Sequence, residues 1–139
     1  MKVVFTRAYR FSASHRLDCA GLTAEENREV YGKCNNPHGH GHNYRLEVSV
    51  TGPVNRMTGM LIDLVDLDAL VDRAVIQRFD LMNLNTDGLF QQEVPTTENL
   101  CRAIYGLLAD DLPRGKLERI RIEETENNFF EYAGEAARG

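Results

Sequence analysis

The sequence has no cysteine pairs of the kind that build disulfide frameworks or thiolate metal sites. Its three cysteines, Cys19, Cys34 and Cys101, are an odd number, and none stands in a C-x-x-C spacing. This pattern argues against a disulfide scaffold and against a structural zinc site made of thiolates. Each thiol is therefore judged by its own surroundings. Cys101 falls within an apolar helical pattern and is expected to be a small buried hydrophobe.

An excess of positive charge and long apolar runs are also missing. The formal net charge is −5, which gives no electrostatic footprint for a nucleic-acid backbone. No stretch approaches the roughly 20 apolar residues that span a bilayer. The N-terminal residues lack the apolar core and cleavage site of a secretory signal. We therefore expect a cytoplasmic protein without nucleic-acid or membrane partners. Its 139 residues suit one domain, 1–139.

Alternating apolar residues predict strands near both ends of the chain. Residues 2–15 carry their aromatic side chains on one parity, and residues 40–51 alternate more regularly before a Gly-Pro stop. Residues 117–124 and 129–132 predict a second pair of strands joined by a tight turn. Strands that pair consecutively at each end favour an antiparallel sheet.

Helical spacing of apolar residues occupies the middle of the chain. It predicts amphipathic helices over 64–75 and 100–108, and the capping box Thr23-x-x-Glu26 opens a shorter helix in the first connection. The order ββααββ indicates an α+β layer, with a four-stranded antiparallel sheet and both helices on one face. Residues 134–139 are expected to fray.

Three of the four histidines suggest a metal site. His40 and His42 are two apart on a predicted strand, so their side chains leave one face with Cα atoms about 6.6–7 Å apart. His15 ends the neighbouring strand on its inward parity and can supply a third nitrogen. Three imidazoles and a water describe a catalytic zinc site with an open position. Solvated or backbone-bonded histidines are the alternative, but the number and geometry of the ligands favour a metal.

Further polar residues could surround such a metal. Cys34 follows Lys33, whose charge would favour a thiolate that acts as nucleophile or general base. Glu124 shares parity with the apolar face of its strand and could grip the N–H pair of an aminopyrimidinone ring, although a solvated strand-end acid is an equal alternative. Thr96 and Thr97 precede a helix, where they would cap its N-terminus or contact a polar ligand.

Several separate motifs cover nearly the whole chain: FSASH (11–15), GKCNNPHGHGHNY (32–44), TGMLIDLVDL (58–67), FDLMNLN (79–85), PTTEN (95–99) and EETENN (123–128). Together they resemble the 6-pyruvoyltetrahydropterin synthase and 6-carboxytetrahydropterin synthase family. The resemblance implies the tunnelling fold, in which the sheets of three subunits join into a barrel and two trimers stack into a hexamer, with active sites between subunits.

The resemblance also implies a reaction and its residues. The family's substrate is 7,8-dihydroneopterin triphosphate, from which triphosphate is eliminated while protons move within the side chain. The segments NNPHGHGHNY, PTTEN and ETENN look more like the pyruvoyl-forming branch than the carboxy-forming branch. The implied site consists of Cys34 as the catalytic thiolate, Asp80 of a catalytic Asp-His pair, Glu124, Thr96 and Thr97 at the pterin ring, and His15, His40 and His42 at zinc.

One position departs from the family pattern. Where the resemblance implies Asp-His, this chain has Asp80-Leu81, and leucine cannot carry a proton. Loss of a positioned acid or base commonly costs about 10²–10⁴-fold in rate. Asp80 alone, water or His38 could substitute, or the chain could be a pterin-binding paralogue with weakened catalysis. Candidates for the triphosphate, by proximity only, are Arg16, Arg28 and Lys33.

Overall fold

Two long antiparallel strands form the centre of the structure, a computed structural model that describes residues 2–135. Strand β1 (Lys2–His15) pairs with β2 (His40–Pro53) along its whole length, from Lys2 opposite Pro53 to His15 opposite His40. The other side of β2 pairs with β4 (Lys116–Glu123), and β4 pairs with β5 (Phe129–Tyr132). The four predicted antiparallel strands are confirmed.

A fifth strand extends the sheet beyond the prediction. The two-residue strand β3 (Met82–Asn83) pairs with β1 in parallel, which gives the order β3-β1-β2-β4-β5. Two residues are too few to show an alternating pattern, so this strand could not be predicted from the sequence. β3 places the Asp80-Leu81 segment at the edge of the sheet beside β1.

The predicted helices are present, and one is longer than expected. The pattern over 64–75 becomes an α-helix, a π-helical turn and a last α-helical turn that ends at Phe79. The bounds are α1 Ala24–Tyr31, η1 Gly32–Asn35, α2 Leu64–Val71, η2 Asp72–Ile76, α3 Gln77–Phe79, η3 Leu84–Thr86, η4 Gly88–Phe90 and α4 Thr97–Leu108. The capping box at α1 forms as predicted. None of the helices within residues 2–135 has the length and apolar character needed to cross a bilayer.

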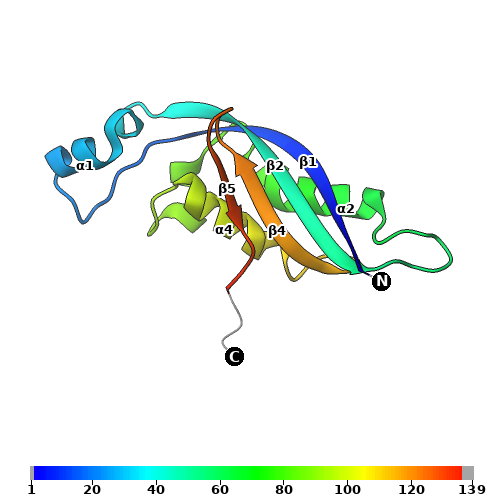
Figure 1. Ribbon diagram of the computed structural model, residues 1–139. Coiled ribbons are helices and arrows are strands. Elements are labelled where there is room, and N and C mark those ends of the chain that lie inside the picture. The colour runs from blue at the N-terminus through cyan, green and yellow to red at the C-terminus, as the bar shows by residue number, and fades with distance from the viewer. Residues whose placement is uncertain (1, 136–139) are drawn as a thin grey trace.

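The core lies between the sheet and the two longer helices. Figure 1 shows α2 and α4 on the same face of the sheet, as predicted. Leu46 and Val48 of β2 are fully buried there against Leu67 of α2 and Ile104 of α4, all 0% exposed. Cys101 is also buried, as expected for its helical position. Of the predicted frayed tail, residues 136–139 lie outside the described residues.

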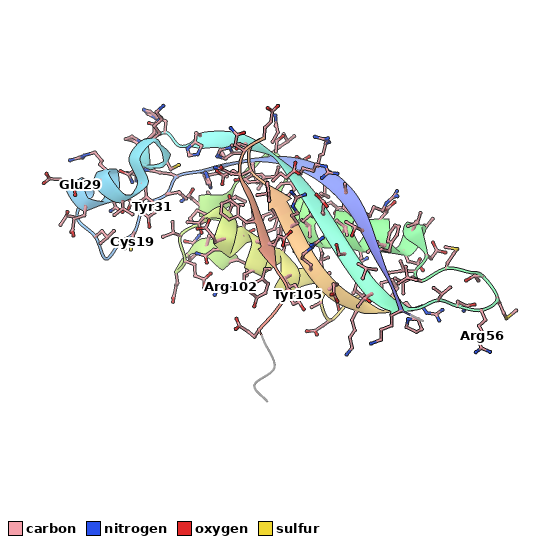
Figure 2. The ribbon with its side chains drawn as sticks, in the orientation of Figure 1. Cys19, Glu29, Tyr31, Arg56, Arg102 and Tyr105 are labelled. Carbon is pink, nitrogen blue, oxygen red and sulfur yellow. The ribbon has the colours of Figure 1, made fainter. Side chains whose placement is uncertain are left out.

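The parity that builds the core also positions the histidines. Because successive side chains alternate between faces of a strand, His40 and His42 leave β2 on the same face as Leu46. Figure 2 shows the α1 segment and the loop that carries Arg56 at opposite ends of the sheet. The histidines lie toward the α1 end, where β1 finishes and β2 begins.

Candidate metal and active site

Three imidazoles converge where β1 ends and β2 begins. One ring nitrogen from each of His15, His40 and His42 lies within 4.8 Å of the other two. His15 Nε2 is 3.0 Å from His40 Nε2, close to the roughly 3.3 Å that separates two nitrogen ligands on a tetrahedral ion with bonds of about 2.0–2.1 Å. The sheet register produces this cluster, since His15 is paired directly with His40.

A backbone carbonyl fixes which nitrogen of His15 is available. His15 Nδ1 lies 2.8 Å from the carbonyl oxygen of Pro95, and a carbonyl can only accept, so Nδ1 carries the proton. The lone pair is then on Nε2, which faces His40. His15 is only 2% exposed, and burial lowers its pKa. A neutral imidazole whose second nitrogen is held by a carbonyl is a typical metal ligand.

His42 carries a buried nitrogen without a hydrogen-bond partner. Its Nε2 makes no hydrogen bond to any described residue, and its nearest acidic neighbour is Glu124 Oε1 at 3.8 Å. Burial lowers the pKa of His42, His40 lowers it further, and Glu124 opposes both. An unpartnered buried polar atom requires an explanation, and a metal ion would satisfy it. The three side chains therefore fit a metal, and imidazole donors suit zinc, copper, iron or nickel.

Glu124 and Thr97 are joined beside the histidines. Glu124 follows the last residue of β4, and its backbone N–H donates to Asn128 at 2.9 Å, which closes the turn to β5. The hydroxyl of the buried Thr97 donates to Glu124 Oε2. Thr96 instead caps α4, because its Oγ1 accepts from the backbone N–H of Asn99 at 3.2 Å. The two threonines thus have different contacts, and only Thr97 touches the carboxylate.

Cys34 lies in the short 3₁₀ turn η1 and shares the electrostatic surroundings of Glu124. Burial raises the pKa of the Cys34 thiol, and the Glu124 carboxylate raises it further. The expectation that Lys33 favours the thiolate is therefore wrong, because the pKa of the thiol is raised rather than lowered. Lys33 is exposed, so its charge is screened by water, whereas Glu124 acts on the thiol across the site.

Asp80 is not brought to this cluster within one chain. Its Oδ1 accepts from the backbone N–H of Ser12 at 2.9 Å. Among residues 2–135 no hydrogen bond or ion pair connects it to Cys34 or the histidines. Leu81 has a left-handed backbone, with φ 62°, and its side chain is 82% exposed. A shallow open pocket of about 320 Å³ crosses the ends of the strands, lined by Leu81 and Met82, by residues 12–14 of β1 and by residues 41–43 of β2, His42 among them.

Two groups at the site were missed by sequence reasoning. Tyr44 is 1% exposed, and its ring lies 5.6 Å from that of His42. Its hydroxyl makes no hydrogen bond within the described residues, and burial, with Glu124, raises its pKa. The alternation that links His40 and His42 continues to Tyr44 and could have identified it. The Pro95 carbonyl had no sequence signal, because any residue supplies a backbone oxygen.

The chain is similar to known pterin enzymes over most of its length. Residues 5–135 match the family model described as 6-pyruvoyl tetrahydropterin synthase. Relatives named 6-pyruvoyl tetrahydrobiopterin synthase are 47% identical in Poecilia reticulata, with 94% of this chain and 89% of the relative covered, and 44% identical in Homo sapiens, with 94% and 90% covered. A putative 6-carboxy-5,6,7,8-tetrahydropterin synthase of Archaeoglobus fulgidus is 38% identical, with 66% of this chain and 73% of the relative covered.

A solved structure agrees with the fold in detail. The structure of Caenorhabditis elegans 6-pyruvoyl tetrahydropterin synthase superposes with a TM-score of 0.93 at 36% identity, with 97% of each chain covered. This likeness confirms the predicted tunnelling-fold subunit.

Proposed function

The chain belongs to the 6-pyruvoyl tetrahydropterin synthase family, and we propose that it is a zinc-dependent lyase that converts 7,8-dihydroneopterin triphosphate to 6-pyruvoyltetrahydropterin and triphosphate. The observation that carries the proposal is the three-histidine cluster beside the Thr97–Glu124 pair. The pyruvoyl-forming product is favoured because relatives of that name are more similar, at 47% over 131 residues, than the carboxy-type relative, at 38% over 93 residues.

The metal in this proposal is zinc, held by His15, His40 and His42. When bound by these three residues, zinc would act as a Lewis acid toward oxygens of the substrate side chain, which would acidify the neighbouring C–H bonds and favour a nearby thiolate. The pairing of His15 with Pro95 supports this assignment, because it presents an unprotonated Nε2 before any metal arrives.

Glu124 would anchor the pterin ring in this site. A carboxylate accepts two parallel hydrogen bonds from a planar N–H pair. The buried hydroxyl of Thr97 already donates to Oε2, so it orients the carboxylate plane. Thr96 would contribute through the helix cap that places Thr97, and also through the N-terminus of α4.

Cys34 would remove a proton from the substrate side chain as a thiolate. Burial and the Glu124 carboxylate raise the pKa of the Cys34 thiol, and a nearby positive charge would favour the thiolate that serves as the base. Loss of triphosphate then requires no external oxidant or reductant, since the hydrogens removed from the side chain are returned to the ring and the side chain.

Oligomerisation would bring Asp80 to the site, which one chain alone does not do. Asp80 lies beside Ser12, at the β3 edge of the sheet, and β5 forms the opposite edge. Open edges favour pairing with another chain. We propose a hexamer of two stacked trimers, in which Asp80 of one subunit approaches the site of a neighbour. A single domain and a cytoplasmic location remain predictions of the sequence.

The leucine at position 81 favours a second candidate function. Without a histidine at this position the chain could bind pterin and turn it over slowly, as a paralogue with weakened catalysis. The experiment is incubation of metal-replete protein with 7,8-dihydroneopterin triphosphate, followed by separation of the products by mass. Triphosphate and the pyruvoyl product support the proposal, and acetaldehyde redirects it to the carboxy-forming reaction. Tight pterin binding without release of triphosphate refutes the lyase and favours the paralogue.

A further inference from the structure

Asn35 is a buried carboxamide next to the proposed base. It is 5% exposed, and both hydrogens of its side-chain nitrogen are used. Nδ2 donates to the carbonyl oxygen of Leu17 at 2.7 Å and to Asp18 Oδ1 at 2.9 Å. Its backbone carbonyl accepts from Arg16 Nε at 3.2 Å. Removing this donor takes a hydrogen bond from both acceptors, and an acceptor left unpaired in a buried place destabilises the local structure.

These contacts connect the turn that carries Cys34 to the segment that follows His15. The backbone N–H of Leu17 donates to the carbonyl oxygen of Cys34 at 2.8 Å. Residues 16–18, Asn35 and the Cys34 carbonyl therefore form one cluster, which we term the Asn35 clasp. Since His15 directly precedes this cluster in the chain, the clasp links the proposed base to a proposed metal ligand.

The segment of residues 16–18 is also held by Asn85. Asn85 accepts from the backbone N–H of Arg16 at 2.7 Å and donates to the Arg16 carbonyl oxygen at 2.8 Å. The η1 turn spans only Gly32–Asn35, and 3₁₀ turns have weaker internal hydrogen bonds than α-helices. Contacts outside the turn therefore help to hold Cys34. The Asn35 side chain donates two of the hydrogen bonds that join the turn to residues 16–18, and the others are Leu17 N–H to the Cys34 carbonyl and Arg16 Nε to the Asn35 carbonyl.

We propose that Asn35 is a positioning residue, whose side chain fixes the Cys34 thiol relative to the three-histidine cluster. Its kinetic consequence depends on the proposed lyase function, whereas its effect on the thiol does not. Asn35 contacts none of the three histidines by hydrogen bond, so metal and pterin binding should survive its loss. Misplacing a reacting group by about 1 Å can cost about 10²-fold in rate.

The test compares Asn35→Ala with Asn36→Ala. Asn36 is the exposed neighbour, and within residues 2–135 its side chain accepts only from the backbone N–H of His38, at 3.3 Å. For Asn35→Ala we expect kcat to fall about 10²-fold, with KM and bound zinc unchanged. Alkylation of Cys34 by iodoacetamide, followed by peptide mass spectrometry, should be several-fold faster than in the parent. Asn36→Ala should match the parent in every measurement.

Each other outcome has a defined meaning. Unchanged kcat and unchanged Cys34 alkylation overturn the proposal, and so does loss of bound zinc in proportion to activity, because either result makes Asn35 merely structural. If the parent releases no triphosphate, the lyase fails, but faster alkylation of Cys34 in Asn35→Ala still supports the clasp. If Asn35→Ala does not fold, Asp18→Ala removes one acceptor at the surface and should shift kcat and alkylation in the same directions by less.

Discussion

Leu81 is a bulky residue in a backbone conformation that favours other residue types. Its φ is 62°, and a left-handed residue with a Cβ costs about 1–2 kcal/mol. The backbone cannot relax easily, because the Leu81 N–H donates to the Ser12 carbonyl at 2.5 Å and the Ser12 N–H donates to Asp80 at 2.9 Å. Asparagine, aspartate and histidine are enriched several-fold at positive φ. Leu81→Asn should therefore stabilise the protein.

The size of the gain follows from the exposure of the side chain. Leu81 is 82% exposed, so its replacement forfeits roughly a fifth of the 1.5–3 kcal/mol that full burial of leucine provides, or about 0.3–0.6 kcal/mol. Relief of the backbone strain exceeds this loss. We expect Leu81→Asn to raise the free energy of unfolding by about 0.5–1 kcal/mol.

Urea unfolding at fixed protein and zinc concentrations measures this change. The midpoint should rise at an unchanged m-value. Met82→Asn is the matched control, because Met82 is 50% exposed and lies in the extended strand β3, so the same polar replacement should lower stability. A lower midpoint for Leu81→Asn, or an equal rise for Met82→Asn, would refute the strain argument.

Leu81→His tests the catalytic side of the same position. Histidine suits the positive φ and adds the proton carrier that the family resemblance implies. Turnover should rise by up to about 10²–10⁴-fold without loss of stability. A folded, zinc-replete Leu81→His enzyme with the kcat of the parent would show that the missing histidine does not limit the reaction.

Three further predictions concern the metal, the core and an ion pair. His40→Ala should abolish stoichiometric zinc binding measured after dialysis, whereas the exposed His38→Ala should retain it and should also keep the turnover of the parent. Leu46→Ala, at a position that is 0% exposed, should lower the free energy of unfolding by about 2–5 kcal/mol in urea titrations. The hydrogen bonds from Arg7 lower the pKa of Asp68, so the ionised carboxylate stabilises the fold above its unfolded pKa of about 3.9. The advantage of the parent over Asp68→Asn should therefore shrink as the pH falls below that value, and a pH-independent difference would contradict this.

Periodic features of the fold could be predicted from the sequence. The alternation through β2 placed His40 and His42 on the buried face, and the helical spacing placed Cys101 in the core. Strand β3 and the π-helical turn at Asp72–Ile76 could not be predicted, because their hydrogen bonds depend on neighbours rather than on a repeating pattern. The positive φ of Leu81 likewise has no repeating pattern behind it, and the hydrogen bond of its N–H goes to Ser12, which is distant in sequence.

The metal-ligating histidines of the site could be predicted from the sequence, but the proton position on His15 and the pKa of Cys34 could not. Residue type and strand parity were sufficient to group the histidines. The proton on His15 depends on the carbonyl of Pro95, 80 residues away. The raised pKa of Cys34 reflects burial and Glu124, not the adjacent Lys33. Proximity along the chain was a poor guide because the fold, not the sequence neighbour, decides which charge faces the thiol.

Zinc titration of metal-free protein, with triphosphate release as the readout, tests the central claim most directly. The proposed lyase depends on a metal held by His15, His40 and His42. We predict that release from 7,8-dihydroneopterin triphosphate is negligible without metal, rises in proportion to bound zinc, and reaches a plateau at one zinc per chain. Equal release by the metal-free protein, or no release at full zinc occupancy, would contradict the account.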